Sequence, residues 1–281
     1  MLAYFDRGLN PPTYDTASFL MWLEYERVAH GEKEVEIEVV PGPNQGFAWN
    51  RLWPADAATR QAMFDAVALP MMHMLPAVTS VRVNYVGPLT GSIGFGRYTA
   101  DFERFLTAYR EGIRPLRPRV DSARDTYITM TLRESAHWPV RNSHITQWIK
   151  AAYDLQKQGR RVVIVRDTCK ADEPLGALEV SPPASHNLED RASLYRGAAV
   201  NLFVSNGPAW FCLALDAPTI ILRPATEGAG RLSSARVVAD KYKLRDGLPN
   251  APSYQKLIWK DDTCENIVEV VAEFLGQRQA A

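Results

Sequence analysis

The sequence predicts an α/β protein built on parallel β-sheets whose faces are covered by helices. Two observations lead to this prediction. In the second half of the chain, from about residue 121, short apolar segments alternate with segments of helical length. Each short segment is apolar almost throughout, as in YITMTL (127–132) and VVIV (162–165). Strands of that kind are typical of a parallel sheet that is buried on both faces.

The second half carries the more regular pattern. Its expected strands are 127–132, 162–165, 201–205, 219–223 and 256–259, and its expected helices are 143–157, 187–196, 208–215, 233–241 and 263–275. Asp261 and Asp262 stand before the last helix, and we expect them to cap it. Right-handed crossovers place the loops that follow the strands along one edge of the sheet, which is where ligands bind in such folds.

The first half follows the same pattern over a shorter length. Its expected strands are 2–5, 35–40 and 80–86, its expected helices are 16–30, 55–75 and 99–112, and an aromatic loop covers 43–54. The glycine-rich GSIGFGR (91–97) has the spacing GxxGxG and not the GxGxxG of a dinucleotide site, so we expect a loop. The charged, proline-bearing segment 114–124 indicates a linker. We therefore expect domains over 1–118 and 119–281.

Composition excludes several classes of protein. Lysine plus arginine equals aspartate plus glutamate, 32 against 32, so no bulk positive charge favours binding to nucleic acid. No segment has the roughly 18 apolar residues of a membrane span. Three widely spaced cysteines predict neither a disulfide framework nor a zinc site. The first residues, MLAYFDRGLNPP, lack the pattern of a secretion signal, and we expect a cytoplasmic protein.

The segment VSNGPAWFCLAL (204–215) predicts a binding site at the end of a strand. After the buried strand come Ser205, Asn206, Gly207 and Pro208. Asn206 can cap the following helix, Gly207 permits close approach of a ligand to the backbone, and Pro208 suits the first helical turn. A helix that begins in this way presents partial positive charge to a phosphate group. The alternative is a well-capped crossover helix without a ligand.

Arg133 comes directly after the strand 127–132, at the same expected edge of the sheet. A guanidinium group there can bind a diphosphate through two hydrogen bonds and neutralise charge on a leaving nucleotide. Arg141 and His144 belong to the loop that follows. The alternative is an arginine in a solvated surface loop. Because Arg133 follows a buried strand, we favour a role in binding.

The segment LEDRASLYRGAAVNLFVSNGPAWFCLALDAPTIILRP (188–224) resembles the donor-binding half of GT-B glycosyltransferases, above all heptosyltransferase-like and fucosyltransferase-like enzymes. The resemblance extends over about 160–240 and to the strand and arginine at 127–133. It implies two Rossmann-like domains, of which the N-terminal one is reduced here. It also implies transfer of a sugar from a nucleoside-diphosphate sugar to a hydroxyl group of a glycan or another acceptor.

The resemblance also implies residue roles. Ser205, Asn206, Gly207 and Pro208 would bind the phosphates and sugar of the donor, and Arg133 would match the phosphate-binding arginine of fucosyltransferase-like members. The loop 181–188, with Ser181, Asn187 and Leu188, would border the nucleotide base. Heptosyltransferase-like enzymes often have an acidic residue near the turn that carries Asn206 here, so the resemblance does not carry over their contact with the sugar.

On the acceptor side, the architecture implies a catalytic carboxylate in the loop after the first strand. Asp6 ends that strand and Asp15 closes its loop. Either can be the base that takes the proton of the acceptor hydroxyl. The alternative for Asp15 is to cap the helix that begins at Thr16.

The sequence contains no metal-binding motif, and we expect a metal-independent transferase without a cofactor. Two other functions remain open. The same scaffold supports nucleotide-sugar epimerases and pyruvyl transferases, and a degenerate GT-B-like protein can bind a ligand without turnover.

Overall fold

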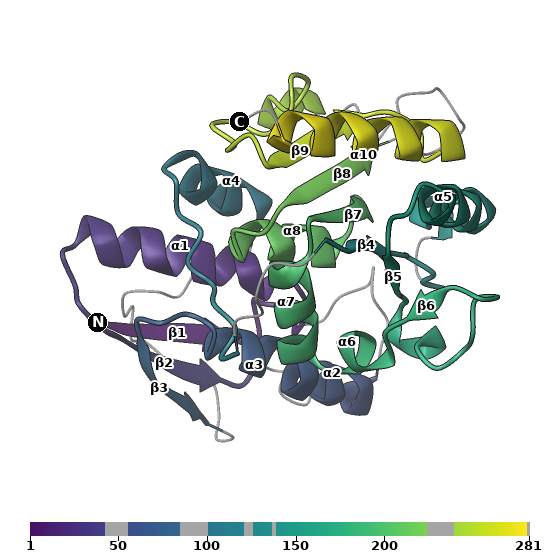
Figure 1. Ribbon diagram of the computed structural model, residues 1–281. Coiled ribbons are helices and arrows are strands. Elements are labelled where there is room, and N and C mark those ends of the chain that lie inside the picture. The colour runs from purple at the N-terminus through teal and green to yellow at the C-terminus, as the bar shows by residue number, and fades with distance from the viewer. Residues whose placement is uncertain (43–55, 85–100, 121–125, 137–138, 224–238, 280–281) are drawn as a thin grey trace. The chain divides into compact units, whose positions relative to one another are not determined.

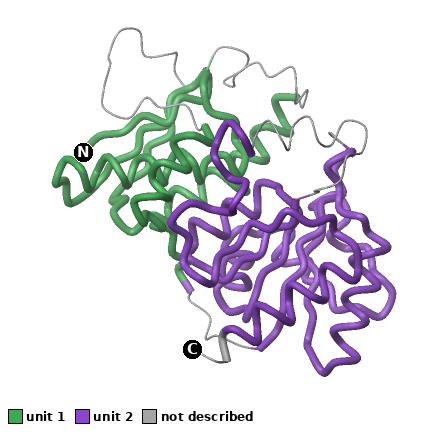
Figure 2. Tube along the Cα trace, turned by 90° about the horizontal axis from the view of Figure 1, so that it is seen from above, with its two compact units in different colours: residues 1–119 green, residues 120–281 purple. Residues whose placement is uncertain are grey.

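The structure is a computed structural model that describes residues 1–42, 56–84, 101–120, 126–136, 139–223 and 239–279. The chain forms two compact units, Met1–Arg119 and Val120–Ala281 (Figure 2). Each unit has its own sheet, and every strand pair in both sheets is parallel (Figure 1). The prediction of an α/β fold with parallel sheets is confirmed.

The described part of the second unit forms a six-stranded sheet. Its strands are β4 (Ile128–Thr131), β5 (Val162–Val165), β6 (Glu179–Val180), β7 (Val200–Val204), β8 (Thr219–Arg223) and β9 (Gln255–Trp259). They lie in the order β6-β5-β4-β7-β8-β9. Numbered along this unit, the order is 3-2-1-4-5-6, which is that of doubly wound nucleotide-binding domains. The direction of winding reverses between β4 and β7, so we expect a ligand at that point.

Helices cover both faces of this sheet. They are α5 (Ile145–Lys157), α6 (Pro182–His186), α7 (Leu188–Gly197), α8 (Gly207–Ala214) and α10 (Cys264–Gln279), with 3₁₀ turns at Pro139–Arg141 and Thr168–Lys170. Ile128 and Leu202 belong to the core that includes Trp148 of α5 and Phe274 of α10.

The alternate residues of the strands point to the opposite face. Phe203 packs edge-on against Tyr195 of α7, with 5.3 Å between the ring centroids. Thr219 donates a hydrogen bond to the sulfur of Cys212 in α8 over 3.2 Å. The period of two along a strand explains why the apolar segments supply both cores.

The first unit contains a three-stranded sheet within the described residues, in the order β1-β2-β3. Its strands are β1 (Leu2–Asp6), β2 (Val35–Val40) and β3 (Val78–Val83), and its helices are α1 (Thr16–Ala29), α2 (Ala57–Met63), α3 (Leu69–Met72) and α4 (Phe102–Arg110). Phe5 of β1 packs edge-on against Phe19 of α1, with 5.1 Å between the ring centroids.

Three predictions about these elements were wrong in detail. The single helix expected over 55–75 is divided by a π-helical turn, Phe64–Ala68, which precedes Pro70 in the first turn of α3. Proline lacks the amide hydrogen that a continuous α-helix needs, so the regular ladder is interrupted there. The short edge strand β6 and the helix α6 lie in a segment that was expected to be a loop.

The third correction concerns Asp262, which does not cap the last helix. Its carboxylate accepts hydrogen bonds from the backbone amide of His144 and from the indole of Trp148, each at 2.8 Å. Asp262 thus joins the beginning of α5 to the segment before α10. At the start of α10, the amide of Asn266 donates instead to the hydroxyl of Thr263 over 3.3 Å.

Several predicted segments fall outside the described residues. They are the aromatic loop 43–54, the glycine-rich segment 91–97, most of the expected helix 233–241 and part of the linker 114–124.

Candidate functional site

The carboxyl edge of the second sheet brings together polar side chains from three adjacent strands. The backbone register pairs Thr131 with Phe203 and Val204 with Leu222. Continued by one or two residues, it places Arg133, Ser205 and Arg223 at one level across β4, β7 and β8. In the alternation along each strand, all three occupy positions on the face of the sheet that α7 and α8 cover. This level lies at the point where the order of the strands reverses.

Arg133 is almost fully buried, with an exposed fraction of 9%. Its amide donates to the hydroxyl oxygen of Ser143 over 3.0 Å, and its carbonyl accepts the Ser143 amide over 3.0 Å. The guanidinium Nη1 donates to Oδ1 of Asn142. Burial and the positive charge of Arg141 lower the pKa of Arg133, and the carboxylate of Asp167 acts in the opposite direction. The charged form of Arg133 is therefore less favoured at this position than in water.

Ser205 is contacted by two arginines. Nη2 of Arg223 donates to its hydroxyl oxygen over 2.7 Å, and Nη2 of Arg141 donates to its carbonyl oxygen over 3.1 Å. The next residue, Asn206, is the N-cap of α8, and its Oδ1 accepts the Ala209 amide over 3.0 Å. The predicted cap is confirmed. Pro208 has no amide hydrogen and Asn206 caps the Ala209 amide, so the amide of Gly207 is the first-turn donor that could face a ligand.

Arg223 is a site residue that the sequence analysis missed. It ends β8 with an exposed fraction of 9%, and its Nε and Nη1 have no hydrogen-bond partner among the described residues. Its guanidinium carbon lies 5.6 Å from the ring centroid of Trp259 on β9. Burial and the nearby charge of Arg141 lower its pKa to about 10. The available signal was its place at the end of the apolar segment TIILR, the same kind of place that identified Arg133.

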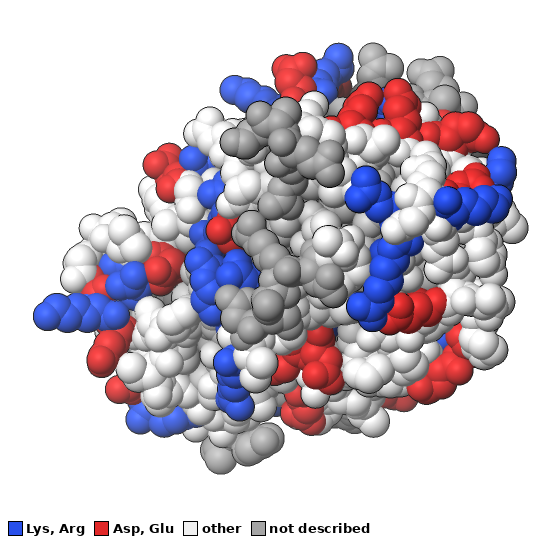
Figure 3. Space-filling model, in the orientation of Figure 1, with Lys and Arg blue, Asp and Glu red and all other residues white. Residues whose placement is uncertain are grey.

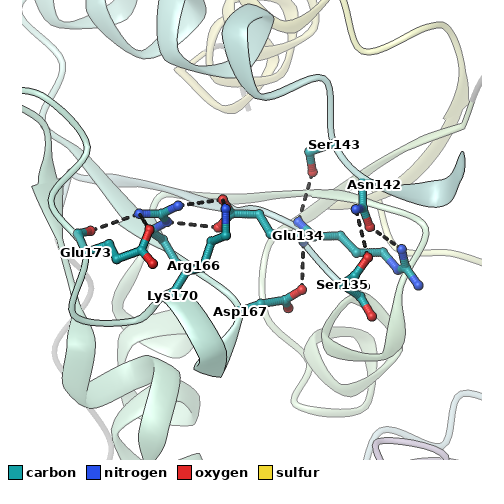
Figure 4. Close-up of polar contacts among 9 residues, drawn as sticks. Glu134, Ser135, Asn142, Ser143, Arg166, Asp167, Lys170 and Glu173 are labelled. Atoms are coloured by element: carbon teal, nitrogen blue, oxygen red, sulfur yellow. Dashed lines mark hydrogen bonds and ion pairs between the residues drawn. The ribbon is translucent and has the colours of Figure 1, made fainter. Parts of the chain in front are cut away.

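A buried ion pair supports the loop that follows Arg133 (Figure 4). The guanidinium of Arg166 binds both carboxylate oxygens of Glu134, at 2.6 and 2.9 Å, and donates to the carbonyl of Glu173 at 2.9 Å. The Arg166 and Glu134 side chains are each 4% exposed. The amide of Glu134 also donates to the carboxylate of Asp167 over 2.7 Å. These contacts hold the backbone beside Arg133 in one position.

Ser181, Asn187 and Leu188 lie elsewhere on the second unit, beyond β5 and β6. The Oδ1 atom of Asn187 caps α7 by accepting the amides of Glu189 and Asp190, at 2.8 and 3.2 Å. Leu188 is 4% exposed. The carbonyl of Ser181 accepts the hydroxyl of Ser185 over 3.3 Å. The side chain of Asn187 therefore caps a helix and that of Leu188 is buried. A role for these residues at a nucleotide base stays a prediction.

In the first unit, Asp6 holds the turn after β1. It is 4% exposed, and its carboxylate accepts the amide of Gly8 over 2.7 Å. Asp15 occupies the N-cap position of α1, but its side chain makes no capping hydrogen bond. Its carboxylate accepts the hydroxyl of Thr13 over 3.0 Å instead. The part of either residue in catalysis remains a prediction.

Other features of the described residues point to no second site. No cluster of three or more histidine, cysteine, aspartate or glutamate side chains could hold a metal ion there. A cavity of about 570 Å³ between α5 and α10 is lined mainly by charged groups. Two of its lysines, Lys150 and Lys157, already pair with Glu265 and Asp154 at 3.3 and 3.0 Å.

Positive and negative side chains are mixed on the one face of the molecule drawn in Figure 3, where lysine and arginine are interspersed with aspartate and glutamate. Across the described portion of the chain, no helix has the length and apolar character needed to cross a membrane.

No protein-family model matches the chain, and no curated protein matches it significantly. Several solved structures have a distantly similar fold. The E. coli heptosyltransferase WaaC, solved with ADP-2-deoxy-2-fluoro heptose, shares 16% identity over 99% of this chain and 100% of that chain, with a TM-score of 0.44. A glycosyl transferase of family 9 from Veillonella parvula shares 9% identity over 98% and 97% of the two chains, with a TM-score of 0.47.

The dodecameric iron-containing glycosyltransferase TibC from enterotoxigenic E. coli shares 15% identity over 79% of this chain, with a TM-score of 0.45. The match spans 57% of the TibC chain. No substrate or residue role follows from likenesses at this level.

Proposed function

We propose that this chain is a glycosyltransferase that takes a sugar from a nucleoside-diphosphate sugar. The observation that carries the proposal is the group of three arginines, Arg133, Arg141 and Arg223, around Ser205 at the edge of the second sheet. These arginines lie near the adjacent strands β4 and β7, where the strand order reverses, and beside the N-terminus of α8, which Asn206 caps. This combination suits a diphosphate, because an anion offsets the cost of burying the charges of Arg133 and Arg223, and a helix N-terminus also favours an anion.

The proposed reaction uses these charges on the leaving group. The acceptor oxygen forms a bond to the anomeric carbon of the sugar, and the bond from that carbon to the phosphate oxygen breaks. The nucleoside diphosphate leaves with the electron pair, and the arginines stabilise its additional negative charge. Positive side chains fixed in this way can replace a divalent cation, which supports a metal-independent reaction.

The proposal assigns the remaining roles by position in each unit. Ser181, Asn187 and Leu188 would border the base of the nucleotide, mainly through backbone groups at Asn187 and Leu188. Asp6 or Asp15 of the first unit would take the proton from the acceptor hydroxyl. A carboxylate that already accepts one hydrogen bond, as both do, keeps capacity for another.

A binding screen followed by a transfer assay tests the proposal. Nucleoside mono- and diphosphates and their sugars are added to the protein, and its thermal unfolding is measured. The set includes ADP and ADP-heptose. A donor present at about 100 times its Kd should stabilise the fold by about 2.7 kcal/mol. Hits are then incubated with pooled hydroxyl acceptors, and both the released nucleoside diphosphate and the glycosylated product are measured.

The matched variants are Arg133→Ala and Arg160→Ala. Arg160 precedes β5 at the opposite edge of the same sheet, so its loss removes one positive charge away from the site. We expect Arg133→Ala to abolish donor binding and Arg160→Ala to preserve it. An isomerised sugar formed without an acceptor would establish the epimerase alternative. Donor binding without any turnover would establish a non-catalytic protein.

A further inference from the structure

Arg223 is the arginine at this edge with the fewest partners. One of its five N–H groups donates to the hydroxyl of Ser205, whereas its Nε and Nη1 have no partner among the described residues. The exposed fraction of Arg223 is 9%, so the residue is 91% buried. A guanidinium group in such a position loses its hydration without gaining a counter-charge, which is unfavourable. The described residues therefore supply no acceptor for the Nε and Nη1 groups of Arg223.

The position of Arg223 separates it from Arg133. Their strands, β8 and β4, are separated by β7, and the register places the two residues at the same level. With about 5 Å between adjacent strands, the two Cα atoms lie about 10 Å apart. Ser205 occupies the strand between them and binds Arg223 through its hydroxyl group. A diphosphate has two phosphoryl groups joined through one oxygen, so it can place one group at Arg133 and the other at the Nε and Nη1 donors of Arg223.

Arg141 connects the two positions electrostatically. Its positive charge acts on both Arg133 and Arg223, and its Nη2 donates to the carbonyl of Ser205. The carboxylate of Asp167 also acts on Arg133, in the opposite direction. An anion that reaches both ends is favoured over one that reaches Arg133 alone.

We infer that Arg223, positioned by Ser205, forms a second phosphate subsite that selects a diphosphate over a monophosphate. The inference rests on the proposed function for the identity of the natural ligand, a nucleoside-diphosphate sugar. One phosphoryl group binds at Arg133 and the start of α8. The other accepts hydrogen bonds from Arg223. Selection arises because a nucleoside monophosphate leaves Nε and Nη1 of the buried Arg223 guanidinium without an acceptor and its charge without a counter-ion.

Titration calorimetry on the full chain tests this inference. The ligands are inorganic phosphate, inorganic pyrophosphate, and a nucleoside mono- and diphosphate of the same base, and the proteins are the wild type and Arg223→Met. We expect the variant to bind pyrophosphate and the diphosphate at least about tenfold more weakly, since a charged hydrogen bond is lost. Its affinity for phosphate and the monophosphate should change by less than about threefold.

Two further variants distinguish a subsite from general loss of charge or structure. Arg133→Ala should weaken binding of mono- and diphosphates alike. Ser205→Ala leaves the charge of Arg223 in place but removes its partner, and we expect a smaller, diphosphate-specific loss. If Arg223→Met unfolds, Ser205→Ala alone supplies the test. Without ligand, Arg223→Met should have a Tm equal to or above that of the wild type, because a buried unpaired charge is removed.

The outcomes separate this inference from the proposed function. Equal losses of mono- and diphosphate affinity in Arg223→Met, or no loss of either, would overturn the subsite even if sugar transfer is observed. Failure of every sugar nucleotide to react, together with a diphosphate-specific loss in Arg223→Met, would reject the transferase and keep the subsite. A wild-type protein that binds pyrophosphate no better than phosphate overturns the subsite directly.

Discussion

Asp167 shows how a single side chain near the arginines responds to its surroundings. The residue lies two positions after β5, and its carboxylate accepts the amide of Glu134 over 2.7 Å. Burial raises the pKa of Asp167, although the Glu134 amide and the charges of Arg191 and Arg133 act against burial. The folded protein therefore binds the proton of Asp167 more strongly than the unfolded chain does.

This raised pKa predicts a pH-dependent difference between the wild type and Asp167→Asn. The stability that protonation of Asp167 contributes is fully present below the unfolded pKa, near 3.9, and is lost as pH rises through the higher folded value. The free energy of unfolding of the wild type, minus that of the variant, should therefore fall from pH 4 to pH 8. Urea unfolding at a series of pH values measures it.

The exposed Asp190→Asn is the control for loss of one carboxylate. A difference that grows with pH in Asp167→Asn would mean that the ionised carboxylate is stabilised by Arg133 and Arg191 more than it is destabilised by burial.

Gly42 is constrained by backbone contact. A Cβ atom built at this position would lie 2.5 Å from both Cα and N of Gly8, in the turn that Asp6 holds. Backbone atoms cannot withdraw as the end of a side chain can, so we expect Gly42→Ala to destabilise the protein by about 1–3 kcal/mol. Chemical unfolding with urea measures the change.

The matched control for this substitution is Gly276→Ala. Gly276 lies in α10, and a Cβ atom there has nothing within 4 Å. Alanine should stabilise that helix by about 0.5–1 kcal/mol. The same chemical change should thus have opposite signs at the two positions, and equal effects would contradict the contact at Gly8.

The two principal arginines differ in how well they can be predicted from the sequence. Arg133 and the turn 205–208 were identified because each follows a buried strand. Arg223 also ends such a strand, but the sequence does not tell a buried arginine from one that extends into solvent. Its significance depends on β8 lying next to β7, which brings it to Ser205. Which strands lie next to each other depends on contacts between distant parts of the chain, so a local sequence pattern does not predict it.

Among the secondary-structure elements, the loop between β4 and α5 depends on the buried pair of Arg166 and Glu134. Removing Arg166 leaves the Glu134 carboxylate 4% exposed, with the Lys170 ammonium group 3.8 Å away. We expect Arg166→Met to destabilise the protein by about 3–5 kcal/mol, because the charge of Glu134 stays buried. Urea unfolding of the variant measures this loss.

The double variant Arg166→Met with Glu134→Gln completes the test. It removes both charges and should be more stable than Arg166→Met alone, since no uncompensated carboxylate remains. If the decrease in the free energy of unfolding of the double variant equals the sum of the decreases in the two single variants, the two side chains act independently.

The sequence predicted most strands because their apolar segments are continuous, and it predicted helices less well. The π-helical turn at Phe64–Ala68 follows from Pro70, but the sequence alone does not say whether the chain bends, ends or widens before a proline. The strand β6 has two residues, too few for a recognisable pattern. Asp262 has the residue type of a cap, and only the packing of α10 against α5 brings it to His144 and Trp148.

For the whole molecule, the division into two units predicts that residues 120–281 fold alone. Their sheet has helices on both faces and a core of its own. We expect this fragment to unfold cooperatively in urea and to bind pyrophosphate within about threefold of the full chain, because all three arginines belong to it. Transfer of a sugar should be absent, since the proposed base lies in the first unit.

Circular dichroism and calorimetry on the fragment and the full chain make the comparison. A fragment without cooperative unfolding would show that the second unit requires the first. A folded fragment that transfers sugar at the full rate would remove Asp6 and Asp15 from the mechanism.

The order of strands also has a kinetic consequence. Pairing of β4 with β7 joins segments about 70 residues apart in the chain, as in Thr131 with Phe203. Such distant pairings are slow to form, and the anion site is absent until they exist. If the transition state for folding lacks these pairings, a bound diphosphate will slow unfolding and leave the refolding rate unchanged. The ligand would then prolong the lifetime of the finished sheet without guiding the chain toward it.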